Sequence, residues 1–227
     1  MRLSRAKTLA AMVPFIGGLW LSPSGFSNDN DTITIDFDHS ETTKVPGGFV
    51  SELSGQGTKI DWEIREEPSA RSGTKVLAQT SSEDINFHFP LLLYDKLLVK
   101  NVAVTVQFKP LSGQIDQAAG IVVRFQDANH FYVARANALK DEVTLFKVVD
   151  GTYHPLAEAT IPVATGEWHI LKLAAQGTHF QVFFDNQPLF TAEDSTYEHR
   201  GKVGLATKSD GVTIFDNLEI ITYDVPQ

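Results

Sequence analysis

The chain of 227 residues carries a formal net charge of -9. This acidic balance argues against nucleic acid and against an anionic membrane surface as partners. The chain has no cysteine, which excludes a disulfide framework and a lipid anchor attached to a cysteine.

The N-terminal residues have the pattern of a secretory signal peptide. A basic start is followed by an apolar run, Thr8–Leu21, and by a short stretch of mostly small residues, Ser22–Ser27. We expect Met1–Ser27 to be removed, with cleavage after Ser24 as the alternative. No other apolar run approaches the ~20 residues that span a bilayer. Residues 28–227 are therefore predicted to form one exported domain, periplasmic or secreted, with no membrane insertion.

The rest of the chain alternates short runs rich in Val, Ile, Phe and Tyr with turn residues. A turn-rich segment, His39–Gly57, is too polar and too often broken by glycine for a helix. The predicted strands, in chain order, are Thr32–Phe37, Asp61–Arg65, Lys75–Gln79, Phe87–Leu93, Val102–Phe108, Ala119–Gln126, Phe131–Ala138, Val143–Val149, Tyr153–Ile161, Trp168–Ala174, His179–Phe184, Pro188–Thr191, Lys202–Thr207 and Val212–Ile221. Short strands separated by turns predict an all-β sandwich or barrel in one domain.

The three central strands, between residues 119 and 149, define the most informative surface. We assume a register in which Gln126 lies opposite Phe131. Alternation with a period of two then places three apolar residues of the first strand on the core face: Ile121, Val123 and Phe125. The opposite face carries four polar side chains: Arg124, Gln126, Arg135 and Asn137.

Several segments resemble a known superfamily. They are FDHSETTKVPGGF near the start, GTKIDWEI, the central GIVVRFQDANHFYVARANALKDEVTLFKVVDG, GEWHILKL, FQVFFDNQPLF and the closing VGLATKSDGVTIFDNLEI. Over Ile35–Ile220 the chain resembles secreted bacterial domains of the concanavalin A-like lectin/glucanase superfamily, in the family-16-like or 3-keto-disaccharide hydrolase group. The resemblance implies a jelly-roll sandwich of two antiparallel sheets. It fixes no activity, because the superfamily contains lectins, hydrolases, lyases and adhesion modules.

Two explanations fit the polar face. Arg124 and Arg135 would be diagonal neighbours, which is unfavourable unless a carboxylate or an oxygen-rich ligand joins them. In the first explanation, the four polar residues line a groove on a concave sheet and bind sugar hydroxyls or a uronate. In the second, the arginines pair inside the protein with carboxylates such as Glu142.

Catalytic and metal-binding patterns are weak. A retaining glycosidase needs two carboxylates about 5 Å apart, and the sequence has no Glu-x-Asp-x-Glu pattern, so a standard glucanase is disfavoured. Asp127, Asn129 and Asp216–Asn217 offer oxygen donors for a calcium ion, although turn and capping roles explain the same residues. No other cofactor is expected.

We therefore expect an exported protein that binds a glycan or a sugar derivative on a polar sheet face. One alternative is a periplasmic hydrolase or lyase that acts on 3-keto-disaccharides or related glycosides. A further alternative is a structural or adhesion domain without a small ligand.

Overall fold

The computed structural model describes residues 31–58 and 60–224, and their regular structure consists of β-strands alone. In chain order the strands are β1 (Thr32–Ile35), β2 (Phe49–Gly55), β3 (Trp62–Glu66), β4 (Lys75–Gln79), β5 (His88–Val99), β6 (Val102–Ser112), β7 (Ala118–Asp127), β8 (His130–Asn137), β9 (Glu142–Val149), β10 (Thr152–Thr160), β11 (His169–Gln176), β12 (His179–Phe184), β13 (Gln187–Glu193), β14 (Gly201–Ala206) and β15 (Val212–Thr222). The predicted all-β architecture is confirmed.

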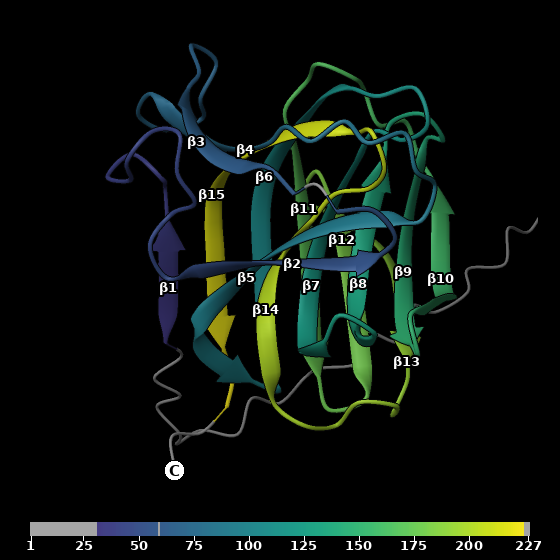
Figure 1. The fold of residues 1–227 in the computed structure, drawn as a ribbon. Coiled ribbons are helices and arrows are strands. Elements are labelled where there is room, and N and C mark those ends of the chain that lie inside the picture. Colours follow the sequence, from purple (N-terminus) through teal and green to yellow (C-terminus); the bar gives the residue numbers. More distant parts are fainter. Residues whose placement is uncertain (1–30, 59, 225–227) are drawn as a thin grey trace, which may run out of the picture.

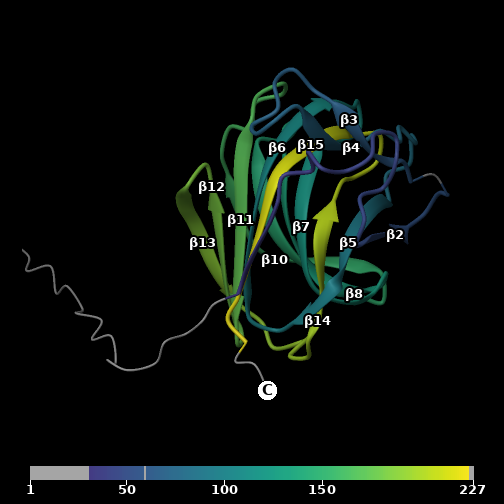
Figure 2. The same cartoon turned by 90° about the vertical axis from the view of Figure 1, so that its left-hand side faces the viewer.

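The strands form two antiparallel sheets that pack face to face, seen edge-on in Figure 2. Sheet A has the order β13-β12-β11-β6-β15-β4-β3, and β1 pairs with β15 beside this path. Sheet B has the order β10-β9-β8-β7-β14-β5-β2. In Figure 1, β2 and β5 run across the front of β14, β7 and β8, so sheet B is strongly curled. We call its side away from sheet A the concave face.

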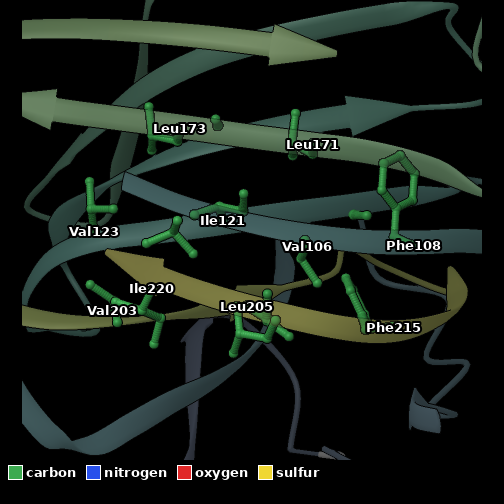
Figure 3. Packing of buried hydrophobic residues seen from close by; sticks show 14 of the residues in the cluster. Val106, Phe108, Ile121, Val123, Leu171, Leu173, Val203, Leu205, Phe215 and Ile220 are labelled. Atoms are coloured by element: carbon green, nitrogen blue, oxygen red, sulfur yellow. The ribbon is translucent and has the colours of Figure 1, made fainter. Parts of the chain in front are cut away.

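The main core lies between the two sheets. Alternate residues of each strand point inward, as a period of two requires. Figure 3 shows side chains of β7 and β14 facing those of β6, β11 and β15, among them Ile121, Val123, Val203, Leu205, Val106, Phe108, Leu171, Leu173, Phe215 and Ile220. Burying such a set of large apolar side chains is the dominant favourable contribution to folding.

The predicted signal peptide, Met1–Ser27, lies outside the described residues. The turn-rich segment His39–Gly57 contains a strand that we did not predict, β2, which pairs along its whole length with β5. Its own sequence lacks clear alternation, so the Leu-rich partner decides its conformation. Within the residues that the structure describes, no helix is long and apolar enough to cross a membrane.

The predicted register between β7 and β8 is wrong for most of the pair. Val123 lies opposite Tyr132, two residues away from the expected partner, and only the end pair Asp127 and His130 follows the expected register. The difference is an irregularity at Arg124, which adopts a left-handed backbone with φ 52°. Gly201 packs directly against it, because a Cβ there would lie 2.4 Å from the Arg124 carbonyl carbon. The bulge therefore reverses which face the residues after Val123 occupy.

Candidate functional site

The concave face has an apolar floor of its own. This second cluster consists of Phe89, Leu91, Leu93, Val122, Phe125, Phe131, Val133, Val148 and Ala206. Phe125, which we expected on the core face, lies here because of the bulge at Arg124. The floor is buried, which means that other parts of the chain cover most of it.

Tyr153 of β10 supplies part of that cover. Its ring stacks on Phe89 of β5 with 4.1 Å between centroids and meets Phe131 and Phe146 edge-on. Its hydroxyl lies 3.3 Å from Oγ of Ser54 on β2. Burial raises the pKa of the Tyr153 hydroxyl above its ordinary value, while Ser54 and Arg135 partly oppose the shift. Tyr153 is therefore a neutral hydrogen-bonding group at neutral pH.

Arg135 of β8 carries a positive charge on the concave face, close to Tyr153. The residue is 8% exposed, and its guanidinium lies 4.7 Å from the ring centre of Phe146. Nη2 donates to Oε1 of Glu142 across a long 3.4 Å, and Nε has no acceptor. Its cross-strand neighbours are Thr144 on one side and Gly120 on the other. The site thus holds a nearly buried guanidinium whose Nε donor is unused.

Asn137 lies two residues further along the same face but is already occupied. Its Nδ2 donates to Oδ1 of Asp116 at 2.9 Å, and its Oδ1 accepts from the backbone N–H of Leu139 at 3.0 Å. Lys208 pairs with the other oxygen of Asp116. These contacts form a buried polar cluster that fixes the turn after β8.

Arg124 lies on the opposite side of sheet B from Arg135. It is fully buried, and its guanidinium lies 5.1 Å from the ring centre of Phe180 and 6.0 Å from that of Tyr132 in the main core. Its three nitrogens donate to backbone carbonyls: Nε to Lys100, Nη1 to Tyr197 and Nη2 to Gly177, at 3.0, 2.9 and 2.6 Å. Burial lowers its pKa, since the charged form loses water contact. The Arg124 guanidinium thus ties together three loops between strands: β5–β6, β11–β12 and β13–β14.

The four predicted residues are therefore not one constellation. Gln126 is exposed and donates to the carbonyls of Arg124 and Arg200. Arg135 and Asn137 share the concave face, whereas the bulge sends Arg124 into the core. The predicted diagonal pair of arginines is wrong, because it depended on an unbroken ladder.

Three further polar groups lie on the same face as Arg135 and were not predicted from the sequence. Ser54 is on the strand that was not predicted, and Tyr153 was assigned only to a weak strand. Glu158 of β10 lies opposite Thr144 of β9 and hence faces the same side as Arg135. The signal for Glu158 was present in the alternation of β10, but a bulge between Pro155 and Ala157 obscured it.

The suggested calcium donors have other partners. Asp127 accepts from the backbone of Asn129 at 2.8 Å, and Asp216 accepts from the backbone of Arg71 and Ser72 at 2.7 and 2.9 Å. In the described part of the chain, no three His, Asp or Glu side chains group in a way that could hold a metal ion. A calcium ion stays a prediction from sequence.

Comparison with known proteins gives a consistent picture. Residues 100–223 match the family described as the C-terminal lectin domain of galactocerebrosidase. Levanase of Bacillus subtilis (strain 168) is 30% identical over 93 residues, which are 41% of this chain and 13% of levanase. The carbohydrate-binding module CBM66 from Bacillus subtilis superposes with a TM-score of 0.58 at 22% identity, over 79% of this chain and 97% of the module.

A second solved structure shares the architecture. Domain 4 of AbnA, a GH43 extracellular arabinanase from Geobacillus stearothermophilus solved with arabinotriose, has a TM-score of 0.53 at 13% identity. The match covers 85% of this chain and 93% of that domain. These likenesses confirm the jelly-roll sandwich of two antiparallel sheets. The finer grouping with 3-keto-disaccharide hydrolases stays a prediction.

Proposed function

Because the chain belongs to the family of the galactocerebrosidase C-terminal lectin domain, we propose that it binds a carbohydrate on the concave face at Arg135. The levanase match, the carbohydrate-binding module and the arabinanase domain support this class of ligand. The arabinanase is described as extracellular, which supports the predicted export of this protein to the periplasm or the medium.

The observation that carries the proposal is the unused Nε donor of Arg135. A buried donor without an acceptor destabilises a protein by roughly 1–3 kcal/mol. A ligand oxygen at this position would remove that penalty. The groups on this face suit a sugar, since Glu142 beside Arg135 offers a carboxylate and Tyr153, paired with Ser54, offers a hydroxyl.

Glu142 also discriminates between classes of sugar. Its carboxylate lies 3.4 Å from the guanidinium, so the positive charge is partly compensated before any ligand arrives. A uronate bound to Arg135 would approach that carboxylate closely, and two like charges repel. Neutral sugar hydroxyls can instead donate to Glu142 and accept from Arg135. We therefore assign a neutral glycan to the concave face.

Calorimetric titration with neutral oligosaccharides tests the assignment. The probes are a levan-type fructo-oligosaccharide, arabinotriose and a galacto-oligosaccharide, each titrated into the intact protein. Arg135→Gln should weaken binding of the recognised probe about tenfold or more, since a hydrogen bond from a charged group contributes roughly 1.5–3 kcal/mol. Gln126→Ala is the matched control, because Gln126 is exposed and, within the described residues, donates hydrogen bonds only to the backbone carbonyls of Arg124 and Arg200.

Two results would contradict the proposal. One is the absence of binding for all three neutral probes. The other is an Arg135→Gln variant that binds as tightly as the parent, with an unchanged free energy of unfolding. If Arg135→Gln is less stable than the parent and the parent itself binds none of the probes, the structural or adhesion role is favoured.

A further inference from the structure

A hollow lies on the outer face of sheet A, on the far side of the molecule from the concave face. It has a volume of 430 Å³, and most of its lining residues come from β11, β12 and β13, the strands at the left of Figure 2. A smaller hollow of 170 Å³ shares two of its lining residues, Lys172 and Phe183. Together they form one groove, which we call the outer groove.

The strand register explains why the surface is hollow. Ala174 of β11 lies opposite Gln181 of β12, which lies opposite Thr191 of β13. Ala174, at the β11 end of this row, has only a methyl side chain, which leaves space between the longer side chains of Lys172 and Gln176 along the same strand. A small side chain therefore forms the floor of the outer groove. The polar groups in the same row are the amide of Gln181 and the hydroxyl of Thr191.

The charges along the outer groove are unequal. At one end, His179 and Glu193 pair across neighbouring strands at 3.1 Å. At the other, the Lys172 ammonium lies 5.3 Å from the ring centre of Phe183, and Lys172 makes no ion pair within the described residues. Its nearest carboxylate along the row is Glu219, which lies two strands away beyond Thr105. Two strand spacings are about 10 Å, at which salt screens most of the attraction.

We propose that the outer groove is a second carbohydrate site, which takes a glycan that carries carboxylates. A uronate group would pair with Lys172, whose charge is otherwise uncompensated. Neighbouring sugar hydroxyls would bond with Gln181, Thr191 and Gln176, which line the same hollow. On the concave face the cation is not free in this way, because Glu142 already compensates the charge of Arg135. The site does not depend on the function proposed for Arg135.

The test compares two forms of one sugar chain. An oligogalacturonate and its fully methyl-esterified form have the same backbone, but only the first carries charge. Titration calorimetry with the intact protein should show binding of the acidic form, weakened by salt. The esterified form should bind about tenfold more weakly or worse, because it loses a charged interaction.

Three variants locate the site. Lys172→Met keeps a long apolar chain against Phe183 and should weaken binding of the oligogalacturonate at least about tenfold. Gln181→Ala should weaken it by a smaller factor, because it removes a neutral hydrogen-bonding group. Arg135→Gln should bind the oligogalacturonate like the parent, while it loses the neutral probe of the concave face.

The proposal fails if the parent does not bind the oligogalacturonate, or if Lys172→Met binds it equally well. It also fails if Arg135→Gln abolishes binding, because the acidic glycan would then occupy the concave face. Failure of the neutral probes alone would instead overturn the function proposed for Arg135 and leave the result for the outer groove to stand by itself.

Discussion

The ring of Tyr153 on β10 stacks on the ring of Phe89 on β5, with 4.1 Å between their centroids. In sheet B the strands β9, β8, β7 and β14 lie between these two. The contact is made across the concave face, because the sheet curls until one edge meets the arm formed by β2 and β5 (Figure 1). The curl places the Tyr153 hydroxyl on the face that carries Arg135, within hydrogen-bonding distance of the Ser54 hydroxyl.

Removing the Tyr153 ring should therefore open the concave face and destabilise it. We expect Tyr153→Ala to lower the free energy of unfolding by about 2–4 kcal/mol, close to the range for deleting a large core side chain. Tyr153→Phe keeps the stack and removes only a 3.3 Å hydrogen bond, so its loss should stay near 1 kcal/mol or below. Urea unfolding of both variants measures the difference. Equal losses would show that the hydroxyl, and not the ring, closes the face.

Arg124 should behave as a structural residue. Arg124→Ala leaves three carbonyls without their donor in a buried place, so we expect a loss of about 3 kcal/mol or more. Arg124→Lys should not restore stability, because an ammonium cannot reach three acceptors as a planar fork does. Binding of the neutral probe by the folded fraction should not change. A stable Arg124→Ala variant with weakened glycan binding would contradict the structural role and show that Arg124 contributes to glycan binding.

Gly120 should resist enlargement. A Cβ at this position would lie 3.1 Å from Cγ2 of Val133, 3.2 Å from the carbonyl oxygen of Ala134 and 3.3 Å from Cβ of Ala206. Gly120→Leu should therefore destabilise the protein by about 1–3 kcal/mol, the usual range for overpacking, and should displace Arg135 opposite. Thermal unfolding and the titration of the neutral probe report the two effects. Unchanged values in both would contradict the observed register.

Acid should lower the free energy of unfolding, in part through protonation of Asp194. Burial by itself would raise the pKa of this carboxyl, but hydrogen bonds from Lys147, Thr196 and the Tyr132 hydroxyl outweigh it and lower the pKa. A lowered folded pKa means that the stabilisation is complete above the unfolded value of about 3.9 and is lost as the pH falls below it.

The variant Asp194→Asn isolates this contribution. It should be less stable than the parent at neutral pH by about 1–3 kcal/mol, the range for hydrogen bonds to a charged group. The gap should narrow as the pH falls from about 4, where Asp194 of the unfolded parent begins to bind protons while the folded carboxyl is still ionised. Urea unfolding at several pH values measures the gap. A gap that stays constant down to the lowest pH would exclude Asp194 as the source.

Standard β-1,3 and β-1,4 glucans should not be hydrolysed. The densest acidic segment, around Glu63 and Glu66, lies on β3 at the end of sheet A and not on the concave face. A reducing-sugar assay with both substrates should give no release above the blank. Release that disappears in Glu63→Gln or Glu66→Gln would reveal a catalytic carboxylate there, and release lost in Glu142→Gln would place catalysis beside Arg135.

The sequence by itself determined the class of fold. Alternation in runs such as Val102–Phe108 and turn pairs such as Asp150–Gly151 and Asp185–Asn186 are local signals, and the structure has strands and left-handed turn residues there. The core-facing residues Ile121 and Val123 also follow from alternation alone, since they precede the bulge. Strand patterns depend on neighbours within a few residues, so a sequence displays them directly.

Only the tertiary structure decided which polar residues share a surface. The bulge at Arg124 depends on a close approach by Gly201 and on carbonyls of Lys100, Gly177 and Tyr197, all distant in sequence. The polar residues that share the concave face with Arg135 come from β2, β9 and β10, and β2 becomes a strand only because β5 pairs with it. Register, curl and burial are sums of many long-range contacts, and no local pattern of residues specifies them.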